Sequence, residues 1–230
     1  MPVSQQSRLL RVQFEAECWE VAFGNAEHSS IGFVRCEINR GMGQVRALRI
    51  SSPLCTMKEA PMTSPMYTSS VPVFKQMLSA LKTILDKANA QCAAKSIEPD
   101  ALLQARLYPD MFPLRKQVQI ASDFARGISA RLAGVEIPVF EGNEQSFLDL
   151  DVLLTKTLMF LDELDSAPFQ NSEFKEIVLR PGTPKEKKLS GQAYLLSYGL
   201  PQFFFHVTTA YAILRHNGLE IGKRDYMGAY

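Results

Sequence analysis

The chain has 230 residues, of which 46% are hydrophobic and 21% charged, with 25 lysines and arginines against 24 aspartates and glutamates. This length suffices for one sizeable core, and one globular domain is expected. The balanced charge provides no basic field that would gather phosphates, so nucleic acid is not an expected partner. No stretch approaches the roughly 20 apolar residues of a membrane span, and no signal-type run opens the chain, so we expect a cytoplasmic protein.

Residues 1–61 differ in character from the rest of the chain. Their short apolar runs are interrupted by polar residues, and neither helical nor strand-like periodicity persists, so little apolar area can offset the entropy lost on ordering. We expect a poorly ordered N-terminal extension. Met62 and Met66 directly precede the first patterned helix, and a native start at either would make the upstream residues appended or mis-annotated. An organelle-targeting leader is the alternative, but the segment holds many acidic residues for one.

From Ser70 onward, apolar residues recur at the spacing of amphipathic helices. A first helix is predicted from an N-cap at Ser70, with Pro72 in its first turn, to about Ala88. A second is predicted to begin at Pro113 and to stop at Gly134, since glycine readily adopts the left-handed conformation that ends many helices. Each carries one apolar stripe, which indicates packing against other helices.

A third helix is predicted over 143–164, with Asn143 as its cap. Two short runs that flank Pro181–Pro184 predict a β-hairpin with a turn of about four residues. The last helix is predicted over about 192–217, kinked or broken at Pro201, which lacks a backbone donor. Four such helices with short connections predict a mainly all-α fold: an antiparallel four-helix bundle with a hairpin between helices three and four.

The last helix carries a polar pair, Gln202 and His206, within a long apolar run. Residues four apart lie on one helical face, and at 100° per residue His206 falls inside the apolar arc. Gln117 falls on the inward flank of the second helix, whereas Gln119 projects to the opposite side. Because a buried amide without partners costs about 1–3 kcal/mol, we expect Gln117 to meet Gln202 and His206 across the bundle. Two interpretations stay open: a satisfied structural cluster or a ligand site.

The other candidate metal ligands do not complete a site. His216 lies ten residues from His206, roughly 15 Å along the helix and rotated by about 80°, so both cannot bind one ion. His28 lies in the N-terminal extension, and the four cysteines fit no CxxC spacing. Asp110 precedes the second helix, where it could act as an N-cap or as a ligand. The sequence therefore predicts no zinc site built on three histidines.

Three segments carry a resemblance to a known family: ARLYPDMFPLRKQVQIASDFARGISARLAGVEIP at 105–138, LPQFFFHVTTAYAILRHNGLEIGKRDYMG at 200–228, and SVPVF at 70–74. They resemble an uncharacterised family of bacterial and fungal proteins, domain of unknown function 1993. That family is similar in fold to the DinB/YfiT-like superfamily of four-helix bundles. The resemblance implies a DinB-like helical bundle domain over 62–230, and it leaves 1–61 without a counterpart.

The better-known members of that superfamily bind a divalent metal through three histidines, one on the second helix and two from an HxxxH on the last. Some resemble thiol-dependent transferases or isomerases. In this chain the HxxxH positions fall on Gln202 and His206, and the second-helix ligand falls near Gln117. Only one of the three histidines is present. The resemblance thus implies a degenerate metal site, and a stoichiometric divalent metal is not expected.

Two functional hypotheses follow. In the first, the bundle binds a small molecule in an interior pocket built from Gln117, Gln202 and His206, with Asp110 as a further candidate. In the second, the protein is an enzyme of thiol-transferase or isomerase type, in which His206 holds a metal weakly with oxygen ligands or acts as a metal-free general base. The three consecutive phenylalanines at 203–205 cannot all enter one core stripe, which favours a homodimer.

Overall fold

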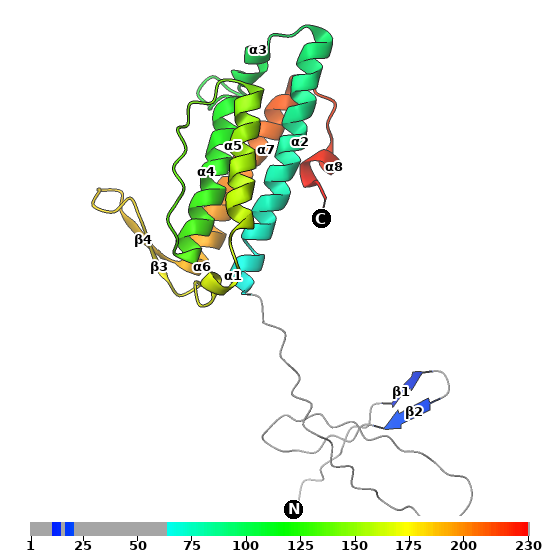
Figure 1. The fold of residues 1–230 in the computed structure, drawn as a ribbon, viewed down its shortest axis with the longest axis vertical. Helices are drawn as coiled ribbons and strands as arrows, with labels where there is room; N and C mark the ends of the chain where they lie inside the picture. Colours follow the sequence, from blue (N-terminus) through cyan, green and yellow to red (C-terminus); the bar gives the residue numbers. More distant parts are fainter. Residues whose placement is uncertain (1–10, 15–16, 21–63, 230) are drawn as a thin grey trace, which may run out of the picture. The chain divides into compact units, whose positions relative to one another are not determined.

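The computed structural model describes residues 11–14, 17–20 and 64–229 (Figure 1). The chain divides into two units, 1–57 and 58–230. In the first unit, β1 (Arg11–Phe14) and β2 (Glu17–Glu20) pair antiparallel, a feature that the sequence did not predict. The remainder of the predicted poorly ordered extension over 1–61 lies outside the described residues, so that expectation stays a prediction.

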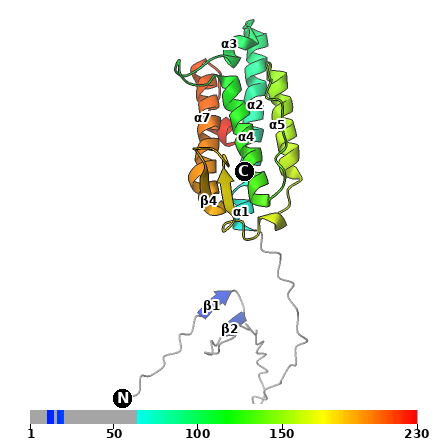
Figure 2. The same ribbon diagram turned by 90° about the vertical axis from the view of Figure 1, so that its left-hand side faces the viewer.

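Four long helices lie side by side in the second unit (Figures 1 and 2). They are α2 (Val71–Lys95), α4 (Leu114–Ala133), α5 (Phe147–Asp162) and α7 (Leu200–His216). Shorter elements join and flank them: α1 (Pro65–Thr68), α3 (Pro99–Leu103), η1 (Ala167–Phe169), α6 (Gly191–Ala193) and α8 (Lys223–Met227). The predicted helical bundle is confirmed.

A long connection sets the direction of α5. Residues 134–146, which we call the strap, run back along the outside of the bundle from the end of α4 to the start of α5 (Figure 1). Arg115 near the start of α4 therefore bonds Gln145 just before α5, so these two helices are parallel. α2 and α5 are antiparallel, because Lys75 in the first turns of α2 pairs with Asp162 at the end of α5. α2 and α7 therefore run in one direction and α4 and α5 in the other (Figure 1).

Two predicted helix caps need correction. Ser70 occupies the N-cap position of α2, but its hydroxyl donates to the carbonyl of Met66 at 2.6 Å and caps nothing. The third helix begins three residues later than predicted, because Ser146 accepts from the backbone N–H of Asp149 at 3.1 Å and closes a capping box. Asn143 lies in the strap and does not cap α5. Gly134 ends α4 with a φ of 76°, as predicted.

The last helix changes its winding before Pro201. A π-helical stretch, η2 (Tyr194–Gly199), joins α6 to α7, and Pro201 then falls in the first turn of α7. A proline is tolerated there because no intrahelical donor is required of it. Gly199 is needed at this point, since a Cβ would lie 2.6 Å from Cδ1 of Ile128 on α4. In place of the predicted break at Pro201, the chain forms a wider π-helical turn just before the proline. At this turn the chain lies close to α4.

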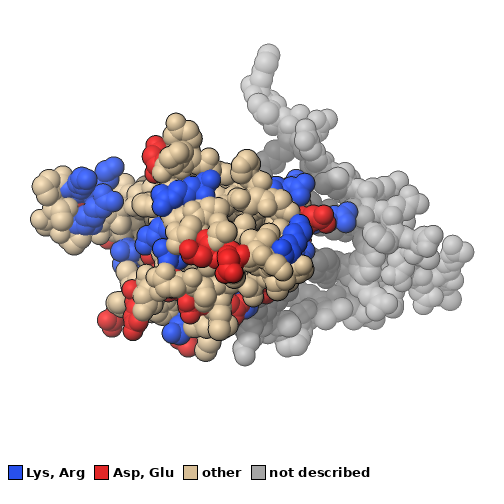
Figure 3. Space-filling view, turned by 90° about the horizontal axis from the view of Figure 1, so that it is seen from above, with Lys and Arg blue, Asp and Glu red and all other residues tan. Residues whose placement is uncertain are grey.

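The predicted hairpin is confirmed as β3 (Glu176–Leu179) and β4 (Lys187–Ser190), which pair antiparallel with Ile177 opposite Leu189. Its connection, 180–186, is longer than the expected turn. Seen from the α3 end of the bundle, acidic and basic side chains are interspersed (Figure 3). No helix in the described part of the chain is long and apolar enough to cross a membrane.

Candidate functional site

The centre of the candidate site is a hydrogen bond between α7 and α4. Nδ1 of His206 lies 2.7 Å from Oε1 of Gln117, and Nε2 of Gln117 donates to the carbonyl of Phe112 at 3.0 Å. The second bond orients the amide, because a reversed amide would set its oxygen against the Phe112 carbonyl. Oε1 therefore faces the imidazole and accepts from Nδ1–H. The neutral ring consequently carries its free lone pair on Nε2.

Aromatic side chains surround the imidazole. The ring of Phe124 lies nearly parallel to His206, with centroids 5.9 Å apart and 18° between planes. Phe205 meets the imidazole edge-on at 5.3 Å. His206 is only 8% exposed, and burial lowers the pKa of its imidazole. The neutral form of the imidazole is therefore favoured at neutral pH.

Nε2 is the second ring nitrogen of His206 and takes no part in the bond to Gln117. It has no hydrogen-bond partner in the described part of the chain. Within that same part, the fully buried side-chain atoms without a partner are Nε of Arg126 and Oγ of Ser129. Since Nε2 is not one of these, it retains contact with solvent. The site thus presents the unprotonated Nε2 of His206, a basic nitrogen, beside the rings of Phe124 and Phe205.

The other predicted site residues take no part in the hydrogen bond between Gln117 and His206. Gln202 is half-buried, and its amide has no hydrogen-bond partner among residues 64–229. Asp110 is exposed in the turn before α4, whose N-cap is Pro113, so the N-cap interpretation of Asp110 is wrong. A ligand role for Asp110 stays a prediction. His216 is exposed at the end of α7.

The donor set does not fit the three-histidine metal centre of the superfamily. Gln117 lies near the second-helix position that the resemblance implies, and its oxygen is bound to Nδ1, while the open nitrogen of His206 is Nε2 on the opposite side of the ring. The two donors therefore cannot converge on one ion in this arrangement. No group of three or more His, Cys, Asp or Glu side chains suited to a metal occurs within the described ranges.

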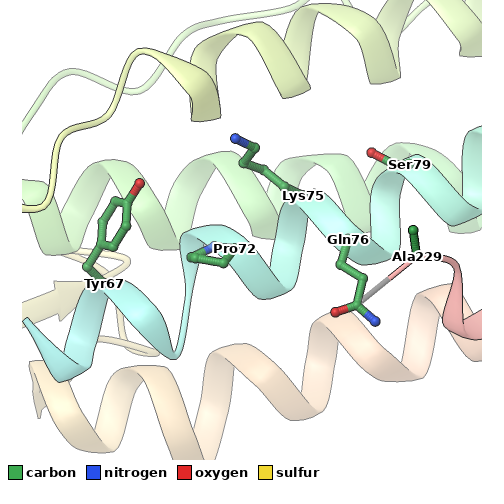
Figure 4. Close-up of a pocket in the computed structure, with 6 residues that line it drawn as sticks. All are labelled: Tyr67, Pro72, Lys75, Gln76, Ser79 and Ala229. Atoms are coloured by element: carbon green, nitrogen blue, oxygen red, sulfur yellow. The ribbon is translucent and has the colours of Figure 1, made fainter. Parts of the chain in front are cut away.

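Two surface hollows lie away from the Gln117–His206 pair. One, of about 470 Å³, follows the start of α2, where Tyr67, Lys75 and Ser79 point to the same side (Figure 4). Lys75 already pairs with Asp162 there. The other, of about 310 Å³, lies between the strap and α5 and includes Val139, Glu144 and Lys156 in its lining.

A buried polar network attaches the strap to α4. Arg126, 5% exposed, donates to the carbonyl of Pro138, pairs with Asp123 and lies 3.9 Å from the centroid of Phe140. Burial lowers the pKa of this guanidinium. Gln119 donates to Glu144 at 2.6 Å. Gln119 is therefore buried as well, contrary to the outward position expected from helical spacing, because the strap covers its face of α4.

The comparisons with known proteins agree with this fold. Residues 66–227 match the family described as Domain of unknown function (DUF1993). The chain belongs to this family. A solved crystal structure described as a DinB family member protein from Shewanella denitrificans is 38% identical to this DUF1993 chain. The alignment covers 72% of this chain and 93% of that one, with a TM-score of 0.68. No curated protein matches.

Three residues at the site of this DUF1993 protein were not predicted as site residues from the sequence. Phe112 contributes a backbone carbonyl that accepts from Gln117, and no sequence pattern predicts such a contact. Phe124 lies seven residues after Gln117 on the same flank of α4, and that spacing was the available signal. Phe205 directly precedes His206 and is 54% exposed, so it is the member of the phenylalanine run that turns outward. Phe203 is fully buried.

Proposed function

We propose that this DUF1993 protein binds a small uncharged molecule at the open Nε2 face of His206. The observation that carries the proposal is the Gln117–His206 bond, which fixes the tautomer and leaves Nε2 as a hydrogen-bond acceptor. Burial keeps the imidazole neutral by lowering its pKa. A polar atom with solvent contact on a largely buried side chain, beside apolar rings, is the kind of group that orients a ligand in small-molecule sites.

The chemistry of the ligand follows from the surroundings of Nε2. A neutral imidazole nitrogen accepts a proton or a hydrogen bond, so the ligand should carry an O–H or S–H donor. Phe124 and the exposed ring of Phe205 offer apolar contact to the body of that ligand. The fitting class is therefore a small uncharged alcohol, phenol or thiol with an apolar portion.

A second candidate function, metal-free general base catalysis, uses the same atom. Nε2 would take the proton of a bound hydroxyl or thiol, which leaves an imidazolium and an activated oxygen or sulfur nucleophile. Nδ1–H would remain bonded to Gln117 throughout, which keeps the ring oriented. This role is supported by the neutral state of His206, because a base must be unprotonated at the working pH.

The test uses tag-free full-length protein with phenol and 2-mercaptoethanol as separate probes. Elemental analysis comes first, and we expect substoichiometric zinc, nickel and iron, because one imidazole with amide oxygens suits these metals poorly. Phenol or 2-mercaptoethanol should then raise the melting temperature of the wild type. The increase should vanish in His206→Ala and persist in His216→Ala, which alters an exposed histidine on the same helix.

Two outcomes would count against the proposal. Equal stabilisation of the wild type and His206→Ala by the probes would place binding elsewhere. Near-stoichiometric metal would show that the protein assembles a metal site from donors that this arrangement does not bring together. Binding without turnover supports the binding role alone, whereas a reaction of bound 2-mercaptoethanol with an added electrophile that requires His206 would support the base.

A further inference from the structure

The outer face of α5 carries an unpartnered apolar stripe. Leu148, Val152 and Met159 are 70%, 43% and 59% exposed. At 100° per residue they fall within about 40° of arc, and half-buried Thr155 lies on the same line. The opposite face of α5 is buried in the bundle, with Leu150 and Leu154 fully covered. A surface helix ordinarily has a polar outer face, whereas α5 carries an apolar stripe there.

Charged groups lie on one flank of the stripe. Val139 of the strap, 92% exposed, lines the hollow of about 310 Å³ together with Val152 on the stripe. Glu141 and Asp149 bring negative charge to the same hollow, and Lys156 lines it from the next turns of α5. The flank therefore carries acidic groups around the start of α5 and a basic group farther along.

We propose that a second copy of this chain docks here, with α5 packed antiparallel against α5 of the second copy about a two-fold axis. An axis between Leu153 and Leu154 sets Leu148 opposite Met159 of the second copy and Val152 opposite Thr155 of the second copy. One axis satisfies both pairs because both are centred at the same point of the helix. The stripe is thus complementary to itself, as a closed two-fold interface requires.

The charges fit the same arrangement. In an antiparallel helix pair, equal flanks of the two helices face each other, so Lys156 of one copy approaches Asp149 of the other at the rim of its acidic hollow. The symmetry creates this contact twice. Opposite charges at matched positions favour this register over others, because a shifted register would leave the two lysines without acidic partners.

The proposal is tested by sedimentation equilibrium of the full chain. We expect a dimer, and we expect Leu148→Glu and Val152→Glu to weaken dimerisation by roughly tenfold or more, because each buries a charge within the apolar seam. Both residues are exposed in the single chain, so the melting temperature of the isolated fold should barely change. Phe205→Glu is the matched control, since α7 lies across the bundle from α5 (Figure 2) and this variant should remain dimeric.

The register is tested by disulfide trapping. A mixture of Leu148→Cys and Met159→Cys chains should yield a cross-linked dimer that neither variant forms alone, with the unmodified chain as the background for its native cysteines. A wild type that is monomeric at about 100 μM, well above a micromolar Kd, would overturn the proposal. Dissociation by Phe205→Glu with an intact Leu148→Glu dimer would overturn it too, as would a mixture that fails to cross-link.

Discussion

Gln117 and His206 are 89 positions apart in the sequence and share a 2.7 Å hydrogen bond in the bundle. This bond joins the two helices that the superfamily resemblance associates with metal binding. Here the amide oxygen occupies the Nδ1 side of the imidazole, so the residues support each other instead of converging on an ion. The result is a neutral histidine whose Nε2 keeps solvent contact and whose ring lies beside those of Phe124 and Phe205.

Removal of the imidazole should destabilise the fold. We expect His206→Ala to lower the free energy of unfolding by about 1–3 kcal/mol, because it opens a cavity and leaves the buried Oε1 of Gln117 without its donor. Urea unfolding measures the change. His216→Ala provides the control, since His216 is exposed at the helix end and should have little effect. Equal losses in both variants would contradict the buried placement of His206.

Stability should depend on pH through His206. Burial lowers its folded-state pKa below the value of about 6.5 in an unfolded chain. Between those two values the unfolded state binds more protons, so the free energy of unfolding rises with pH. This contribution is fully present above about pH 6.5 and is lost as the pH falls through the folded pKa. Urea unfolding at a series of pH values should show that the free energy of unfolding falls more steeply with falling pH for the wild type than for His206→Gln. Parallel curves would contradict the lowered pKa of His206.

A carboxylate at position 117 should favour the charged form of His206. In Gln117→Glu, a negative charge in contact with Nδ1–H favours the imidazolium, so the pKa of His206 should rise relative to the wild type. Proton NMR titration of the histidine ring signals measures this change. An unchanged pKa for His206 would mean that residues 117 and 206 do not touch in solution.

The start of the folded domain can be located by truncation. We expect a chain that begins at Met62 to melt within a few degrees of the full chain, which corresponds to less than about 1 kcal/mol. A chain that begins at Val71 should melt lower. It loses the buried side chain of Met66, the 2.9 Å bond from Ser64 to the carbonyl of Phe169, and the contact between the rings of Tyr67 and Phe169. Equal melting of both would show that α1 adds nothing.

Helical periodicity predicted the parts of the site that depend on which way a side chain points. His206 and Gln117 each lie on the inward side of a regular helix, and the cost of leaving an amide unpaired was enough to predict their contact. The same reasoning does not extend to the expected contact between Gln117 and Gln202. The carbonyl of Phe112 and the imidazole already satisfy Gln117, so no bond to Gln202 is required.

Features that depend on the path of the connections were not predictable in the same way. The strap makes α4 and α5 parallel and buries Gln119, yet periodicity says nothing about which face a loop will cover. The buried guanidinium of Arg126 is another such case, because its partners at Pro138 and Phe140 lie in that loop. Local rules likewise placed the cap of α5 at Asn143, since they could not rank it against Ser146.

The most direct test of the central claim is the protonation of the His206 ring, read from proton–nitrogen NMR correlations of the histidine side chains at about pH 8, where a histidine is neutral. The structure requires a proton on Nδ1 and a bare Nε2, and addition of phenol should shift the Nε2 resonance while Nδ1–H persists. A proton on Nε2 in the free protein would contradict the account, because Gln117 would then face a bare Nδ1 and no acceptor would be open to a ligand.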